Sequence, residues 1–519
     1  MWLAAGLPAG AFFSGDSGVK LIAALDAIGH PGRPFEIDLP RIGGRPTTLV
    51  DPMVVVHGDH GHPLQSPLFP PLSAPLIAAL GLRGAFVLPA LAFVALVPLL
   101  ELIRRRAAPD VAPSALAWLT IGASPLLLYA LEFWEHAPAV ALLTAATAAA
   151  LGGAHGASST RLAAAGGALA GAGVLLRPEG AWYAAGLVLT IARPRWLAFA
   201  CGAAAVGLPF AAANYAHFGN PLGAHASAVL APIGVEFLAG RLARLHEWVW
   251  PSSAAHAAGL LLVAAAWVPG RLAKDDRARQ LLALLGVAVV AVLAARGSLP
   301  QGSFWQGFPL ALLALVPVSA GGVRVRQLAA LATVSVAGVV LTATNDGGAQ
   351  WGVRYLLIAA PPLLLLAARG ATGASGAGPW RGGRLAAIVV ICLAGAMTSR
   401  TAYLELRGTK RNYDGLVSAT ASFVPPGDII VTNVWWLDQV AAALHGTRTF
   451  LFVPDAASAS GALADLRGEH IDRVTLAWAA DSLPFSLERT LDGACFRITA
   501  IRDVPVRGLR LASARCVPE

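Results

Sequence analysis

A long polar interruption near the amino end of this chain is centred on Phe13-Ser14-Gly15-Asp16-Ser17-Gly18-Val19-Lys20. The interruption covers residues 14–82, in a chain whose other segments up to residue 400 are mostly apolar. A carboxylate just beyond a membrane segment is costly unless it is paired or solvated, so Asp16 is a candidate functional residue. The interruption also carries Lys20, Asp26, Glu36, Asp38, Asp51, His57, Asp59, His60 and His62.

The composition places the chain in a lipid bilayer. Hydrophobic residues make up 56% of the 519 positions and charged residues 13%, whereas soluble proteins average about 25% charged residues. The formal net charge is +9, and the arginines stand in short clusters between apolar runs. Cytoplasmic loops of membrane proteins show that distribution, which argues against nucleic acid as a partner.

The apolar runs predict an α-helical polytopic membrane protein with about 13 transmembrane helices within residues 1–400. Arg104-Arg105-Arg106 end one span and mark that end as cytoplasmic. Because the number of spans is odd, residues 401–519 are predicted to lie on the extracytoplasmic side. The predicted spans are 2–13, 84–103, 113–130, 137–152, 162–176, 180–191, 197–213, 254–268, 281–295, 309–320, 328–344, 356–368 and 385–399.

The first predicted span is short. As a helix, residues 2–13 would reach only about 18 Å, against a hydrocarbon core of about 30 Å. They carry no basic segment and no clear cleavage site, so we do not predict a signal peptide. Either the first helix is abbreviated or the sequence starts late.

The tail, residues 401–519, differs in character from the rest of the chain. Predicted strands alternate with predicted helices, which indicates a small α/β domain with a mostly parallel sheet. The tail has no Gly-rich phosphate loop. The expected strands are 428–433, 448–453 and 472–478, and the expected helices are 437–444 and 457–467.

The four cysteines fall into two pairs. Cys201 and Cys392 lie in apolar spans and are expected to be small buried hydrophobic residues. Cys495 and Cys516 lie in the tail, where they could form a disulfide if the tail is outside the cytoplasm.

The polar clusters of the apolar region are predicted to gather on the same side of the membrane as Asp16. A transporter would instead carry polar residues through the span centres. Here the span interiors are nearly all Ala, Leu, Val and Gly, which favours an enzyme that acts at the membrane surface on a lipid-borne substrate. The clusters are 132–136, 177–179, 214–221 and 346–355.

Five short motifs follow one another along this region: Phe13-Ser14-Gly15-Asp16, Pro67-Leu68-Phe69-Pro70-Pro71-Leu72, Arg177-Pro178-Glu179-Gly180, Phe218-Gly219-Asn220-Pro221-Leu222 and Trp351-Gly352-Val353-Arg354-Tyr355-Leu356. In their order and common sidedness they resemble the GT-C class of glycosyltransferases. The resemblance is to the protein O-mannosyltransferase and lipid A aminoarabinose transferase branch in particular. It covers most of residues 1–400, and a soluble domain after the last span is usual in that class.

The resemblance implies a polyprenyl-phosphate-linked sugar as the donor and transfer on the extracytoplasmic face, normally with inversion. Asp16 matches the first-loop acid of that class and would be the general base that deprotonates the acceptor hydroxyl. Cations would stabilise the charge that grows on the departing phosphate. Arg354 is the first choice, because a guanidinium binds phosphate bidentately, and Lys20 and Arg177 come next. Ser17 departs from the class, which often has a second acid at that position.

Two further groups could position the acceptor or a divalent metal ion, which is the one cofactor that the sequence suggests. Glu132, Glu135 and His136 place two acids and a histidine in one short loop at the membrane edge. Another set of residue types that ligate zinc lies in the first loop, where solvation explains it equally well. Its members are His57, Asp59, His60 and His62.

Structural roles are the alternatives for the main candidates. Asp16 could cap a helix over residues 17–28. Arg354 could be an interfacial residue that extends its charge toward the headgroups. Arg177 could form a local ion pair with Glu179.

The leading hypothesis is a multi-pass glycosyltransferase of the cell membrane, with an extracytoplasmic tail. Its partners would be the lipid bilayer, the polyprenyl-phosphate sugar donor and an acceptor that the sequence does not identify. A transporter or flippase of lipid-linked glycans is the first alternative, and it predicts activity that survives loss of Asp16. A catalytically inactive membrane scaffold is the second, in view of Ser17 and the short first span.

Overall fold

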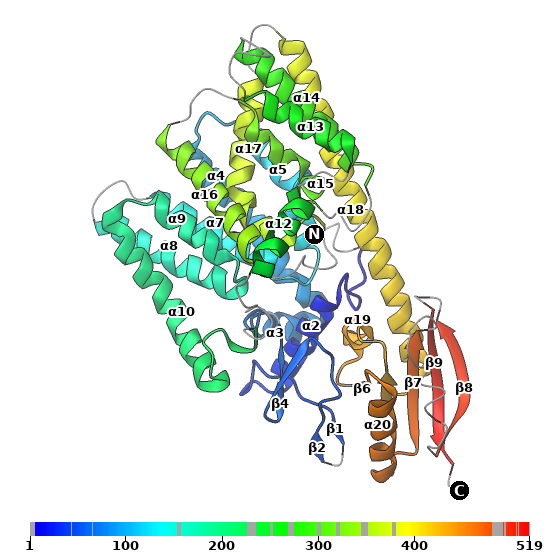
Figure 1. Ribbon diagram of the computed structural model, residues 1–519. Helices are drawn as coiled ribbons and strands as arrows, with labels where there is room; N and C mark the ends of the chain where they lie inside the picture. Colours follow the sequence, from blue (N-terminus) through cyan, green and yellow to red (C-terminus); the bar gives the residue numbers. More distant parts are fainter. Residues whose placement is uncertain are drawn as a thin grey trace. The chain divides into compact units, whose positions relative to one another are not determined.

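The apolar runs of the chain fold into helices in the computed structural model (Figure 1). A helix satisfies its backbone polar groups within the segment, as a lipid environment requires. The chain forms two compact units: a helical unit, Leu88–Glu405, and a terminal unit made of Met1–Val87 and Leu406–Glu519. The structure describes residues 6–42, 44–64, 66–152, 157–225, 235–249, 253–267, 275–297, 303–317, 322–343, 351–375, 380–479, 491, 495–504, 506 and 508–517.

The helical unit packs its helices through small residues. Gly167 and Gly202 let α8 and α10 approach closely: a Cβ atom on either glycine would lie 1.9 Å from a backbone carbonyl oxygen of the other helix. The α-helices are α4 (Val87–Ala107), α5 (Pro113–Gly122), α6 (Leu126–Ala130), α7 (His136–Gly152), α8 (Ala157–Leu176), α9 (Gly180–Thr190), α10 (Trp196–Phe218), α12 (Val235–Val249), α13 (Ala254–Ala265), α14 (Asp276–Ala294), α15 (Phe304–Gly307), α16 (Val323–Thr342), α17 (Ala360–Ala374) and the first part of α18 (Arg381–Phe423). The 3-10 helices are η2 (Arg193–Arg195), η3 (Gly223–His225), η4 (Pro309–Leu315) and η5 (Arg354–Ala359).

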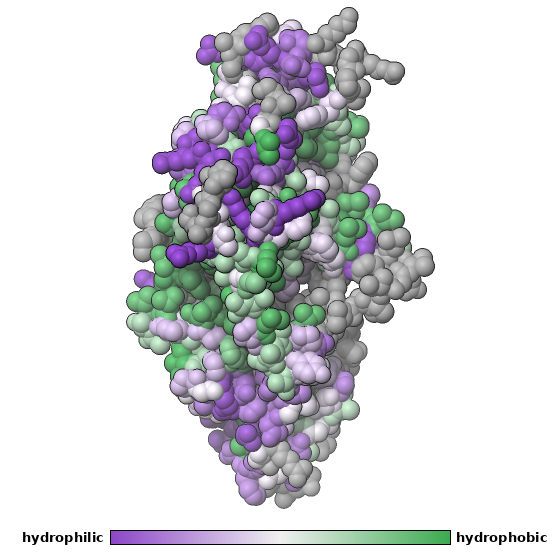
Figure 2. Space-filling view, turned by 90° about the vertical axis from the view of Figure 1, so that its left-hand side faces the viewer, coloured by the Kyte–Doolittle hydropathy of each residue, from purple (hydrophilic) through white to green (hydrophobic). Residues whose placement is uncertain are grey.

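Among the described residues, seven helices are long and apolar enough to cross a membrane. They are Phe69–Ala107, Ser159–Leu176, Arg193–Phe218, Asp276–Ala294, Val323–Thr342, Arg354–Gly373 and Arg381–Phe423. Large apolar side chains on them, such as Leu91, Val94 and Leu208, are more than half exposed. Figure 2 shows a broad field of hydrophobic side chains on the face that it draws. These features confirm a polytopic helical membrane protein, while the number of about 13 spans stays a prediction.

Several predicted boundaries are wrong, each for a local reason. Residues 6–13 of the expected first span form turns and bends. The expected span over 113–130 is broken between α5 and α6 at Ala123–Pro125, since proline cannot continue the backbone hydrogen bonds of a helix. The expected span over 309–320 is the seven-residue 3-10 helix η4. The last helix, α18, does not stop at residue 399 but runs to Phe423.

The amino-terminal part of the terminal unit is not one open loop. Helix α2 (Gly15–Gly29) packs against α3 (Phe69–Leu80), which η1 (Gly81–Phe86) follows. Two antiparallel hairpins lie between these helices in the sequence. They are β1 (Arg41–Ile42) with β2 (Arg45–Pro46), and β3 (Val54–His57) with β4 (His60–Pro63).

The carboxyl-terminal part of the terminal unit is a five-stranded sheet in the order β6-β5-β7-β9-β8. Alternate side chains of one strand enter different cores, as the pleat of a strand requires: Val431 packs with α20 (Ala456–Gly468), and Ile430 packs with the end of α18 and with α19 (Leu437–Val440). Helices therefore cover both faces of the sheet (Figure 1). The strands are β5 (Ile429–Thr432), β6 (Thr449–Phe452), β7 (Arg473–Ala479), β8 (Phe496–Val504) and β9 (Leu509–Cys516), and the 3-10 helix η6 (Ala442–Leu444) follows α19.

The predicted α/β domain is present, but the expectation of a mostly parallel sheet is wrong. Strand β5 pairs in parallel with β6 and β7, whereas β9 pairs antiparallel with β7 and β8. The sequence did not indicate β8, because most of its side chains are exposed and it lacks an alternating apolar pattern.

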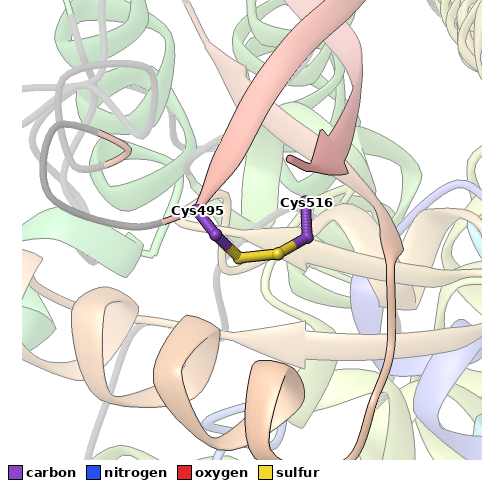
Figure 3. The surroundings of a disulfide bond; sticks show 2 residues. All are labelled: Cys495 and Cys516. Carbon is purple, nitrogen blue, oxygen red and sulfur yellow. A yellow bond between two sulfur atoms is a disulfide. The ribbon is translucent and has the colours of Figure 1, made fainter. Parts of the chain in front are cut away.

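The predicted pairing of Cys495 with Cys516 is confirmed (Figure 3). The two Cα atoms lie 4.8 Å apart, within the range that a disulfide spans. The bond joins the start of β8 to the end of β9. The expected burial of the other two cysteines is wrong: Cys201 is exposed on α10 and Cys392 is partly exposed on α18.

Candidate active site

Asp16 lies in the first turn of α2, in the terminal unit. The helix begins at Gly15, with Ser14 in the N-cap position. The structural alternative, in which Asp16 caps a helix over residues 17–28, is therefore wrong. Its charge is still favoured there, because the first turn of a helix carries a partial positive charge.

The two glycines around Asp16 allow α19 to lie directly on α2. A Cβ atom on Gly15 would meet the Oε1 atom of Gln439, and one on Gly18 would lie 1.7 Å from the carbonyl oxygen of Gln439. Real Cβ atoms do not approach other atoms so closely. The pattern Gly15-Asp16-Ser17-Gly18 is therefore a docking surface for α19 as well as the carrier of the acid.

Asp51 and Asp438 form the polar centre of this contact. Asp51 is 3% exposed, and it accepts hydrogen bonds from the side-chain nitrogen of Gln439 and from the backbone nitrogen of Met53, each at 2.5 Å. The Asp51 and Asp438 carboxyl groups hydrogen-bond each other. Two carboxyl groups in such contact repel each other when both are ionised, so ionisation of the pair is disfavoured.

Burial and mutual repulsion raise the pKa values of this pair. The pKa of Asp51 is raised by burial first and also by the negative charge of Asp16, against the lowering effect of its hydrogen bonds. The pKa of Asp438 lies well above the usual range of an aspartate, because of burial and then the charge of Asp51. The structure therefore brings Asp16 together with two acids that the sequence did not assign to a site.

Further charged groups lie along α2. Lys20 is buried, one helical turn after Asp16. Asp26 forms an ion pair of 2.8 Å with His445, which follows η6, so a second contact joins α2 to the tail. Lys410 on α18 is also buried, with its ammonium 4.2 Å from the ring centroid of Phe86.

A separate cluster in the helical unit is built around Arg177, between α8 and α9. Its guanidinium donates to Glu135 at 2.9 Å and to Glu179 at 2.5 Å. The predicted local ion pair with Glu179 is thus confirmed, and Glu135 adds a second carboxylate from the start of α7. A buried arginine between two carboxylates compensates their charge, and its removal would leave them unpaired.

Tyr355 joins Arg177 to Arg354. The guanidinium carbons of Arg177 and Arg354 lie 5.3 Å and 5.6 Å from the centroid of the Tyr355 ring, within the range of a cation–π contact. Trp248 of α12 packs its ring 6.2 Å from that of Tyr355. Arg354 is 9% exposed, so its side chain lies inside the unit. The interfacial alternative required it to extend toward the headgroups.

The acidic loop before α7 is fully enclosed. Glu132, Glu135 and His136 are each at most 2% exposed, and the His136 ring lies 5.0 Å from that of Tyr129. Glu135 forms an ion pair with Arg177, and the acceptor or metal role of the loop stays a prediction. Trp134 completes the aromatic group at 4.9 Å from Tyr129.

The histidines of the first loop lie on the β3–β4 hairpin, and two of them have polar partners. His60 pairs with Glu36 at 3.3 Å, and the Nδ1 atom of His62 lies 3.2 Å from the carbonyl oxygen of Phe35. Across the described parts of the chain, no group of three or more Asp, Glu, His or Cys side chains is placed to hold a metal ion. The geometry of the described residues therefore gives no support to a metal role for His57, Asp59, His60 and His62, and that role stays a prediction.

Other predicted candidates are divided between the two units. Asp16 and Lys20 belong to the terminal unit, and Arg177, Arg354 and Glu132 belong to the helical unit. Residues 346–350 of the fourth predicted polar cluster lie outside the described residues. Asp438 and Gln439 were missed altogether, although the Gly15 and Gly18 spacing could have indicated a close helix contact.

Comparison with known proteins places the fold. No family model and no curated protein matches the sequence. Among solved structures, ArnT from Cupriavidus metallidurans bound to undecaprenyl phosphate overlaps with a TM-score of 0.53 at 13% identity, over 100% of this chain and 96% of that one. The chain shares the fold of ArnT. The resemblance to the GT-C class is thereby confirmed at the level of the fold.

Two further structures overlap less closely. ArnT from the same organism in the apo state gives a TM-score of 0.49 at 13% identity, over 99% of this chain and 96% of that one. The oligosaccharyltransferase AglB from Archaeoglobus fulgidus, in complex with an inhibitory peptide and a dolichol-phosphate, gives 0.43 at 14% identity. That overlap covers 89% of this chain and 65% of AglB.

Proposed function

We propose that the chain is an integral membrane glycosyltransferase that moves a sugar from a polyprenyl-phosphate donor to an acceptor hydroxyl. The observation that carries the proposal is the fold that the whole chain shares with ArnT. The ArnT structure in that comparison is bound to undecaprenyl phosphate. Residues 1–400 would be the membrane domain and residues 401–519 an extracytoplasmic domain. The seven described helices that are long and apolar enough to cross a membrane support the membrane location.

Asp16 is the general base of the proposed reaction. It takes the proton of the acceptor hydroxyl while that oxygen attacks the anomeric carbon of the donor sugar. The bond from the anomeric carbon to the phosphate oxygen breaks, and its electron pair leaves with the polyprenyl phosphate. Attack opposite the leaving group inverts the anomeric configuration.

Arg354 is the proposed partner of the donor phosphate. Its guanidinium carbon lies 5.6 Å from the centroid of the Tyr355 ring, and the planar geometry of a guanidinium suits phosphate oxygens. Arg177 is weaker in this role than the sequence predicted, because Glu135 and Glu179 already hold it. Lys20 lies in the same helix as Asp16 and is the remaining cationic candidate.

The Cys495–Cys516 disulfide supports an extracytoplasmic tail. Disulfides persist in oxidising compartments and are rare in the cytosol. Transfer on the extracytoplasmic side then follows for Asp16, because Asp16 and the tail belong to the same compact unit.

The test compares Asp16→Asn with the wild type in membranes supplied with a radiolabelled polyprenyl-phosphate sugar. Asparagine keeps the size of the side chain and cannot accept the proton, so transfer should fall by about 100-fold or more. Donor binding, measured separately with the labelled lipid, should stay within about twofold, because no binding role is assigned to Asp16.

Asp465→Asn is the matched control, because Asp465 is exposed on α20 in the same unit. It should transfer sugar at the wild-type rate. Wild-type transfer by Asp16→Asn would exclude the proposed base. Lipid-linked glycan movement without transfer, unchanged in Asp16→Asn, would instead identify a flippase.

A further inference from the structure

We propose that α19 of the tail supplies positioning residues for the Asp16 base: Gln439 holds Asp51 beside Asp16, and Asp438 completes the anionic pair. The inference rests on the proposed function and deepens it. It makes the tail a part of the reaction centre, although a soluble domain after the last span could equally have been an independent module.

The first support is the fit of α19 on α2. Gly15 and Gly18 flank Asp16 in the sequence, and both lie against Gln439 at distances that only glycine permits. The side chain of one residue on α19 thus sits over the turn of α2 that carries the acid. A shift of α19 would move the surroundings of Asp16 directly.

The second support is the direction of the hydrogen bonds. The amide nitrogen of Gln439 donates to Asp51 and lies 3.2 Å from the carbonyl oxygen of Trp435, which fixes the amide. Asp51 comes from the first loop and Gln439 from the tail, 388 positions later. One amide therefore ties the first loop to the tail at the position of the proposed base.

The third support is charge. The negative charge of Asp16 raises the pKa of Asp51, so the two carboxyl groups lie close enough to interact, and Asp51 in turn interacts with Asp438. A neighbouring anion makes a carboxylate a stronger base. Titratable groups on the elements around α19 include Lys20 and Asp26 on α2, Arg407, Lys410, Arg411, Tyr413 and Asp414 on α18, and His445 after η6.

The experiment measures kcat and the donor KM of the full-length protein in detergent, with a polyprenyl-phosphate sugar, across pH. Gln439→Met keeps the length of the side chain and removes the donor to Asp51, so kcat should fall at least tenfold with KM within about twofold. The double variant Asp51→Asn/Asp438→Asn removes the pair's negative charge. Its acidic limb of kcat against pH should move to lower pH by about half a unit or more.

Three results separate the possible failures. If Asp16→Asn is inactive while Gln439→Met and the double variant keep the wild-type kcat and pH profile, the positioning role is overturned and the proposed function stands. If Asp16→Asn is active, the proposed function itself fails. If Gln439→Met does not fold, as judged by its thermal unfolding midpoint, the double variant decides, because asparagine at both positions keeps the size of the side chains; Asp465→Asn is again the control.

Discussion

At the scale of single residues, the arginines of the helical unit have different tasks. Arg177 is enclosed by Glu135 and Glu179, so its charge is matched within the protein. Arg354 differs from Arg177 in that its described contact is with the aromatic face of Tyr355. An aromatic face helps to orient a guanidinium, whose planar geometry suits an anion such as phosphate.

Arg354→Ala should therefore lower kcat/KM for the polyprenyl-phosphate donor by about 100-fold, because the phosphate loses a charged partner in the transition state. Arg354→Lys should recover part of the loss, since it keeps the charge but not the bidentate geometry. Steady-state kinetics with the labelled donor measure both. Arg326→Ala, an exposed arginine of α16, is the control, and equal kinetics for Arg326→Ala and Arg354→Ala would remove Arg354 from the donor site.

The sequence pointed to these arginines but not to the acids around Asp16. Arg354 and Arg177 stand in short motifs, which a sequence displays directly. Asp51 appeared only as one of many polar residues in a long loop. Asp438 and Gln439 become relevant only when the tail folds onto α2, and a contact across 388 positions leaves no local signal.

At the scale of elements, most apolar helices were predictable, whereas their ends and several strands, including β8, were not. Apolar runs identified α7, α8, α9 and α13 to within a few residues, because their composition changes at both ends. The end of α18 was missed by more than twenty residues, since its polar second half forms a helix that packs on the sheet. Hydrophobic content predicts where a membrane segment lies. It does not predict where the helix ends, because the backbone hydrogen bonds can continue into polar sequence.

Helix α2 offers a test of its contact with α19. Alanine favours helix by about 1 kcal/mol over glycine, but in Gly18→Ala the new methyl group would lie 1.7 Å from the Gln439 carbonyl oxygen. Such overpacking costs about 1–3 kcal/mol, so Gly18→Ala should lower the unfolding midpoint of the purified protein. Gly29→Ala, where no atom lies within 4 Å, should leave it unchanged or raise it. Equal midpoints for the two variants would contradict the contact.

At the scale of the whole molecule, the same compact unit contains the first loop and the tail. Helix α2 of the first loop and the tail helices bury each other through glycines, an amide and the ion pair of Asp26 with His445. The first loop and the tail must therefore lie on one side of the membrane before this unit can form.

That requirement leads to the last prediction, which concerns the topology. Helix α18 has 43 residues, so it is about 65 Å long and exceeds the hydrocarbon core of about 30 Å. It can cross the membrane and still reach the sheet. A reporter enzyme that needs an oxidising compartment should be active when it is fused after Glu519, whereas a reporter that folds only in the cytoplasm should be inactive there. The same two reporters fused after Asp110, beyond the Arg104-Arg105-Arg106 cluster, should give the opposite result. A cytoplasmic result at Glu519 would place Asp16 on the wrong side for an extracytoplasmic donor, and it would conflict with the Cys495–Cys516 disulfide as well.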